Sequence, residues 1–268
     1  MFTHPFLLAV GTLTRREIVR FLRQRNRVIG ALATPLAFWF MIGSGVGSSF
    51  SGTSTGSKVT DTAAYLHYFF PGTLLLIVLF TAIFSTISII EDRREGFLQG
   101  VLVSPIPRSA FVLAKLLGGT LLAFSQCLLI YLVALTFGLP WSVGAFFLFT
   151  GTIFVLGLAL TALGYLIAWP LDSTQGFHAI MNLFLMPLWF LSGALFPLSG
   201  SAGWLKYLGQ LNPLTYGLGL IRQSLEPGLA LPVGVPNPFL SGAITVAFAA
   251  LLSWASIEIT KRMNVRNP

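Results

Sequence analysis

The longest uncharged stretch of the chain constrains its fold more than any other feature. Between Lys115 and Asp172 lie 56 residues without Asp, Glu, Lys or Arg. A single membrane-spanning helix takes about 17–25 residues, so this stretch holds two spans. Gly138-Leu139-Pro140-Trp141 supplies the turn between them. Only 9% of the chain is charged, against about 25% in a soluble domain, and we therefore expect an all-α integral membrane protein.

Apolar runs on either side of this stretch complete the expected membrane domain, which covers residues 28–268. Each run is long enough to cross a hydrocarbon core of about 30 Å as a helix. Charged or Pro- and Gly-rich segments separate the runs. The pattern predicts six transmembrane helices, at about residues 28–46, 66–90, 116–137, 143–168, 177–196 and 239–259.

Two segments outside these spans have the composition of membrane interfaces. In residues 12–27 the apolar side chains fall near one helix face. We expect an amphipathic interfacial helix in the N-terminal segment 1–27, with a basic segment without a helix as the alternative. Residues 203–225 are rich in Trp and Tyr, which gather at interfaces, and predict a re-entrant or interfacial hairpin between the fifth and sixth spans. The arginines of the interfacial helix are Arg15, Arg16, Arg20 and Arg23.

The basic residues predict the orientation. Six spans place both termini and the loop 91–115 on one side of the membrane, with 13 Lys and Arg residues, and leave three on the other side. Because short cytoplasmic loops carry an excess of Lys and Arg, we expect this side to be cytoplasmic and the hairpin to be extracellular. Basic residues that flank apolar runs orient a membrane protein, so we expect no nucleic-acid partner.

No catalytic or metal site is evident in the sequence. Residues 52–58 contain Gly and Lys but lack the spacing of a phosphate-binding P-loop. We therefore expect no ATPase site and no cofactor in this chain, and the chain is not expected to be an enzyme. Its histidines, His4, His67 and His178, lie in separate segments, whereas a zinc site needs clustered ligands.

Charged residues are absent from the centres of all six expected spans. Secondary carriers mark their ion pathways with such charges, and a membrane-embedded lipid-linked transferase needs convergent acidic or histidine side chains. Both classes stay open as alternatives, although the sequence favours neither. Lys115 stands at the end of the third expected span, where its ammonium group can reach water.

A charged segment between the second and third spans carries the strongest motif. Residues 91–95 hold three acidic and two basic side chains between uncharged runs, which indicates a solvated, salt-bridged face. The motif Glu91–Phe97, then Leu102–Arg108 and Lys115, resembles the cytoplasmic signature of ABC-2 type transport permeases. The stretches 190–197 and 211–216 resemble the fifth span and the extracellular hairpin of the same family. This family provides the membrane subunits of bacterial ABC exporters.

The resemblance implies an assembly and a mechanism. The chain would pair with a second permease, as a homodimer or a heterodimer, in the lipid of the bacterial plasma (inner) membrane. Two separate ABC ATPase subunits, which bind ATP and Mg, would dock on its cytoplasmic side. The segment after the second span would be the coupling helix that transmits their closure to the spans, and the N-terminal helix would also touch the ATPase.

The same resemblance assigns residues to roles. The substrate would pass outward between the first and fifth spans; it is a drug, a lipid-like molecule or a glycan, and the apolar composition favours a drug or lipid-like cargo slightly. The residues implied in coupling to the ATPase are Glu91, Asp92, Arg93, Arg94, Glu95, Gly96, Ser104, Pro105 and Arg108. The pathway candidates are Gln126, Asn182, Trp189, Phe190 and Ser192, for which hydrogen bonds between helices are the alternative.

Overall fold

The computed structural model describes residues 3–50, 58–136, 140–196, 198, 201–225 and 237–262, and this part of the chain is helical without strands. The P-loop-like residues 52–57 lie outside it. The helices are α1 (Thr3–Arg23), α2 (Arg25–Phe50), α3 (Lys58–Ser85), α4 (Ile87–Arg94), α5 (Phe97–Val103), α6 (Arg108–Thr136), α7 (Val143–Ala168), α8 (Thr174–Phe190), α9 (Gly203–Leu211), α10 (Pro213–Leu225) and α11 (Pro238–Arg262).

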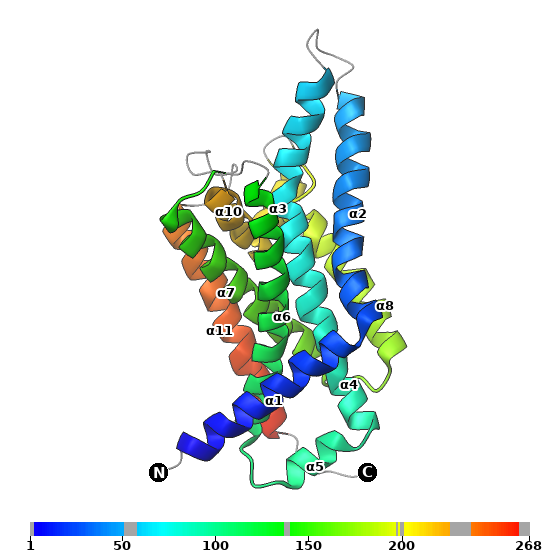
Figure 1. Cartoon of the computed structure of the whole chain (residues 1–268), viewed down its shortest axis with the longest axis vertical. Helices are drawn as coiled ribbons and strands as arrows, with labels where there is room; N and C mark the ends of the chain where they lie inside the picture. Colours follow the sequence, from blue (N-terminus) through cyan, green and yellow to red (C-terminus); the bar gives the residue numbers. More distant parts are fainter. Residues whose placement is uncertain are drawn as a thin grey trace.

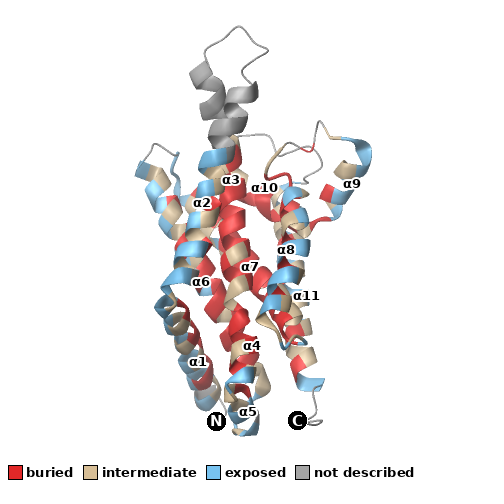
Figure 2. Ribbon diagram, turned by 90° about the vertical axis from the view of Figure 1, so that its right-hand side faces the viewer, coloured by how far each residue is buried: buried red, intermediate tan, exposed pale blue. Residues whose placement is uncertain are grey.

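The helices form an elongated bundle around α3 (Figure 1). The continuous apolar run through α3 and α4 is the most buried of the long helical stretches, because α2, α6 and α7 pack around it. On the other side of α7, α11 and α10 complete the bundle. Figure 2 shows the buried residues concentrated along α3, α4 and α7. The core therefore runs along the bundle axis.

Four helical stretches are long and apolar enough to cross a membrane, namely Tyr68–Arg94, Arg108–Thr136, Val143–Ala168 and Pro238–Arg262. They correspond to the second, third, fourth and sixth expected spans. The first expected span falls in α2, where the described apolar helix Val28–Met41 is shorter. The fifth falls in α8, which has 17 residues. The six-span layout therefore stays a prediction.

The expected loop 91–115 is mostly helical. α4 ends at Arg94, and Gly96 follows between α4 and α5 with a φ of 75°, the left-handed conformation that glycine adopts at low cost. α5 ends at Val103, and the next residue, Ser104, is extended (ψ 156°), as expected for a residue before proline. α6 begins at Arg108, eight residues earlier than the expected third span. The segment is thus two short helices and the first turns of α6.

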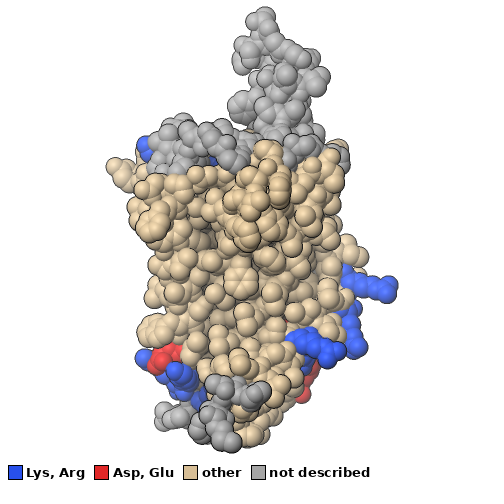
Figure 3. Space-filling view, turned by 60° about the vertical axis from the view of Figure 1, so that its left-hand side comes forward, with Lys and Arg blue, Asp and Glu red and all other residues tan. Residues whose placement is uncertain are grey.

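The charges gather at one end of the bundle. Most of the Lys, Arg, Asp and Glu side chains visible in Figure 3 lie at the end that also holds α5 and both ends of the described chain. We call this the charged end. α1 runs obliquely across α6 there, and α9 and α10 lie at the opposite end (Figures 1 and 2). α10 is largely buried, whereas α9 is largely exposed.

Candidate functional site

Three ionisable side chains from three helices meet inside the bundle at the charged end. Asp92 of α4 is 0% exposed, Lys115 of α6 is 5% exposed and Glu17 of α1 is 8% exposed. The Nζ atom of Lys115 lies 2.5 Å from Oδ2 of Asp92 and 2.8 Å from Oε1 of Glu17. It also donates to Oγ of Ser88 at 3.0 Å. The ammonium group thereby uses all three of its donors.

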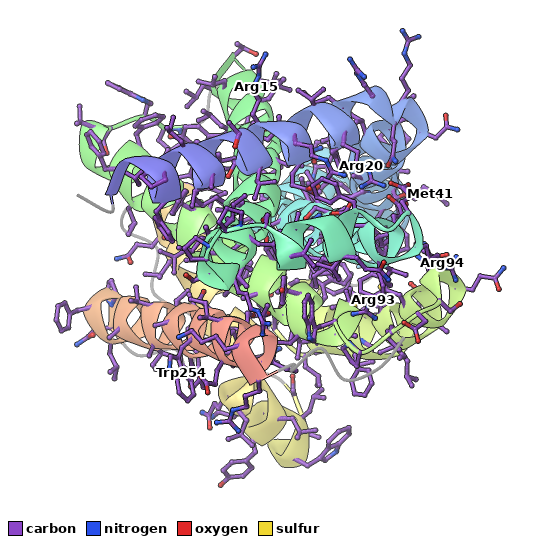
Figure 4. The ribbon with its side chains drawn as sticks, turned by 90° about the horizontal axis from the view of Figure 1, so that it is seen from below. Arg15, Arg20, Met41, Arg93, Arg94 and Trp254 are labelled. Atoms are coloured by element: carbon purple, nitrogen blue, oxygen red, sulfur yellow. The ribbon has the colours of Figure 1, made fainter. Side chains whose placement is uncertain are left out.

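Two arginines of α1 enclose this centre from outside. The Arg16 guanidinium donates to both carboxylate oxygens of Asp92, at 2.8 and 3.3 Å, and to Oε1 of Glu17 at 2.9 Å. Arg20 points from α1 toward α4 (Figure 4), where it contacts Asp92 as well as two exposed or half-buried glutamates. The α1–α4–α6 ion network consists of Arg16, Glu17, Arg20, Ser88, Glu91, Asp92, Glu95 and Lys115.

The electrostatics of the network favour its charged state. Burial alone lowers the pKa of Arg16, but the hydrogen bonds and charges of Asp92 and Glu17 outweigh it, so the pKa of Arg16 is raised above its ordinary value. Buried ions lose hydration, and this cost is offset only where each ion keeps close partners. Asp92 has three cationic partners, which makes it the centre of the network.

This geometry corrects the interpretation of the charged segment as a solvated face. Asp92 and Lys115 are buried because α1 packs across α6 and its side chains reach α4, whereas Arg94 and Glu95 do stay exposed. The expectation that Lys115 reaches water at the end of a span is also wrong. Glu17 was not among the predicted site residues. Its signal was a lone acidic residue among the arginines of an amphipathic helix, on the same face as buried Thr14 and Phe21.

Arg93 and Arg94 bind in the opposite direction, to the turn between α7 and α8 (Figure 4). The NH1 group of Arg93 lies 2.9 Å from Oδ1 of Asp172 and 3.2 Å from the carbonyl oxygen of Leu171, and NH2 donates to the carbonyl oxygen of Trp169. Nε of Arg94 donates to the carbonyl oxygen of Asp172 at 2.9 Å. The position of Arg93 is favourable because it brings a cation to the C-terminus of α7. These bonds join α4 to the turn between α7 and α8, and the ion network joins it to α1 and α6 on the other side.

α5 forms the tip of the charged end (Figure 1). Its inner side holds Leu98, which is buried, and Phe97, whose ring centroid lies 3.6 Å from Cζ of Arg16. Its outer side presents Gln99, Gly100 and Val103, the last of which is 84% exposed. The ion network and Phe97 therefore hold α5 with one small, mainly uncharged face toward the surroundings.

The remaining predicted coupling residues shape the link from α5 to α6. Oγ of Ser104 donates to the carbonyl oxygen of Val101 at 2.6 Å, and Pro105 is exposed. The NH1 group of Arg108 donates to the carbonyl oxygen of Lys261 at 3.1 Å. Arg108 thus joins the start of α6 to the end of α11, a contact that the sequence did not predict.

The five pathway candidates do not form one surface. Gln126 is buried and accepts a hydrogen bond from Thr81 at 2.5 Å, which joins α6 to α3. Trp189 is 0% exposed and donates from Nε1 to the carbonyl oxygen of Gly72 at 2.9 Å, and buried Ser192 donates to the carbonyl oxygen of Trp189. Only Asn182 and Phe190 lie on the exposed side of α8.

Comparison with known proteins identifies related sequences. The sequence model of the family described as ABC-2 type transporter matches residues 9–225, which include the whole ion network. The putative transport permease ycf38 of Cyanophora paradoxa is 28% identical over 81% of this chain and 74% of its own length. Nodulation protein J of Rhizobium meliloti is 24% identical over 78% of this chain and 77% of its own.

A third relative matches a shorter part. The probable multidrug ABC transporter permease YbhR of Escherichia coli (strain K12) is 26% identical over 53% of this chain and 38% of its own length. The family match and the apolar helices together describe a multi-pass membrane protein. The chain belongs to the ABC-2 type transporter family, as a transport permease subunit.

Proposed function

We propose that this chain is the membrane subunit of an ATP-binding-cassette exporter and that α4 and α5 receive the motion of separate ATPase subunits. The observation that carries the proposal is the placement of α5. It stands at the tip of the charged end, and the buried ion network behind it joins α4 to α1 and α6. A force on α5 would therefore move several helices together.

The contacts around α4 support this transmission. Breaking one partner from a buried ion pair costs about 3–5 kcal/mol, so the α1, α4 and α6 contacts resist separation. Arg93 and Arg94 extend the connection to the turn before α8. Among the described helices, α8 packs mainly against α3 and α4. Motion of α4 would thus reach α8, the helix of the proposed fifth span.

The expected assembly follows from the family and from the positive-inside rule. The charged end would face the cytoplasm, with both termini on that side, in a bacterial plasma (inner) membrane. Two ATPase subunits would supply ATP and Mg, and a second permease would complete a homodimer or a heterodimer. The exposed outer side of α5, with Gln99, Gly100 and Val103, is the surface that we assign to the ATPase.

The cargo class is proposed from the surface of α8 and from the relatives. One relative is named a multidrug transporter permease and another a nodulation protein. The outer side of α8 exposes Leu183 (69%) and Phe184 (62%) around Asn182. Such a surface suits an amphipathic or hydrophobic molecule. We propose outward movement of a drug or a lipid-like molecule, with a glycan-type substrate as the alternative.

The experiment compares two tryptophan substitutions at open glycines. A Cβ at Gly100 of α5 or at Gly203 of α9 meets nothing within 4 Å, and both glycines are exposed, so we expect both tryptophan variants to fold. Gly100→Trp should abolish co-purification of the ATPase with the full chain and with it substrate-stimulated ATP hydrolysis. Gly203→Trp, at the opposite end, should leave both unchanged. Retention of the ATPase by Gly100→Trp would show that α5 is not the docking helix.

The buried triad also introduces a second candidate, a secondary carrier. Ionisable residues inside a membrane domain mark many proton pathways, and Glu17, Asp92 and Lys115 are such a group. Their position at the end of the bundle and their complete pairing favour the structural role. Transport in vesicles that persists without ATP and stops when a protonophore collapses the proton gradient would support the carrier and contradict the exporter.

A further inference from the structure

α1 has a second face that the ion network does not use. Leu8, Arg15 and Leu22 are seven residues apart, and a helix drifts only about 20° over seven residues, so the three side chains line up. All three are exposed, with Leu8 at 63% and Leu22 at 55%. Arg15 points away from α4 and α5 (Figure 4). This outward face lies opposite Thr14, Glu17 and Phe21, which are buried.

The five arginines of the N-terminal segment whose side chains the structure describes fall into two sets. Arg16 and Arg20 bind the carboxylates of the network. Arg15, Arg23 and Arg25 are exposed, and none of them makes an ion pair with a residue that the structure describes. These three exposed guanidinium groups have no counter-charge among the described residues, and Arg15 lies between the two exposed leucines of the outward face. A partner that satisfies both must offer anionic groups next to apolar surface.

We infer that the outward face of α1, together with Arg23 and Arg25, binds the phosphate groups of anionic phospholipids. Guanidinium groups bind phosphate oxygens through paired hydrogen bonds, and leucines beside them enter the acyl-chain boundary. The apolar part of α2 begins at Val28, so Arg23 and Arg25 stand where a spanning helix leaves the headgroup layer. These phospholipids belong to the membrane leaflet at the charged end.

The inference rests on the membrane location of the family and not on ATPase coupling. Its test therefore uses the full chain alone, purified in a neutral detergent, so that its failure leaves the proposed function untouched. Native mass spectrometry measures the binding of phosphatidylglycerol and, separately, of phosphatidylcholine. R15Q/R23Q removes two of the three exposed arginines. K261Q/R262Q is the matched control at the charged end of α11, and each pair lowers the net charge of +8 by two.

We expect R15Q/R23Q to weaken phosphatidylglycerol binding about thirtyfold, from about 1 kcal/mol per arginine at an anionic surface. Phosphatidylcholine binding should stay unchanged, and the control should lose less than about threefold. R15K/R23K, which keeps the charges, should retain most of the preference. An equal loss in both glutamine variants, an equal loss for both lipids, or a loss in R15K/R23K as large as in R15Q/R23Q would overturn the inference.

The wild-type chain provides a test that needs no variant. Contacts between exposed arginines and headgroups are screened by salt, so the preference for phosphatidylglycerol should shrink as ionic strength rises. A preference that is independent of salt would contradict the inference, even if R15Q/R23Q failed to fold.

Discussion

Replacing Lys115 with methionine tests the ion network most directly. Methionine keeps most of the length and volume of the lysine side chain and removes only the ammonium group. The change takes a close partner from Asp92, at 2.5 Å, and a partner from Glu17, at 2.8 Å, while both carboxylates stay inside the bundle. The loss therefore reports the cost of a buried charge without its counter-charge.

The remaining partners set the size of the effect. Removal of one member of a buried ion pair costs about 3–5 kcal/mol. Asp92 retains Arg16 and Arg20, and Glu17 retains Arg16 and the Ser88 hydroxyl. We therefore expect the lower end, a decrease of about 3 kcal/mol in the free energy of unfolding. The double variant K115M/D92N should lose less than the sum of the two single variants, by about 1–3 kcal/mol.

Reversible unfolding of the chain in mixed detergent micelles, followed by circular dichroism, measures these differences. R262M is the control, because Arg262 pairs with Glu258 at 3.0 Å on the surface, where its side chain is 77% exposed. Exposed pairs contribute little. If K115M were as stable as R262M, or if the losses in the double variant simply added, the network would not be the coupled, buried element that its geometry indicates.

Three further substitutions test the contacts of α4. Arg93→Gln removes the cation at the end of α7 and the contact with Asp172. The ATPase should still co-purify. The rate of substrate-stimulated ATP hydrolysis should fall about tenfold, which corresponds to an increase of about 1.4 kcal/mol in the free energy of activation. Gly164→Ala puts a Cβ 2.8 Å from Oγ1 of Thr86, and unfolding in detergent should show a loss of about 1–3 kcal/mol from overpacking. Gly96→Ala has open space but a φ of 75°, and the same assay should show a loss of about 1 kcal/mol.

Periodicity and composition predicted the features that depend on local sequence. The fourth span was expected at 143–168, and α7 has these bounds, because Ser142 caps its first turn and a polar turn follows it. α10 begins with a similarly local contact, in which Asn212 Oδ1 accepts from the backbone N–H of Leu214. Such signals lie within a few residues of the element that they define.

Features that depend on distant contacts were not predicted. The burial of Asp92 arises from α1, and its partner Arg16 is 76 residues away in the chain. α8 ends at Phe190, before the expected residue 196, although the sequence stays apolar. Gly193 takes a φ of 81° there, and its carbonyl oxygen accepts hydrogen bonds from Tyr68 and Arg222, which come from α3 and α10. Periodicity does not show these tertiary partners.

The ion network is costly because its charges are buried, and its position on α4 suits the role that we propose for this helix. α3 and α4 are separated at Thr86, whose Oγ1 donates to the carbonyl oxygen of Ile83 at 2.6 Å, and Gly119 and Gly164 pack closely on either side. A hydroxyl bonded in this way bends a helix. Below this joint, the network fixes α4 to α1 and α6. An apolar core would hold the helices as well as buried ions do, but the ions also fix one orientation of α4, which a helix that transmits a displacement requires.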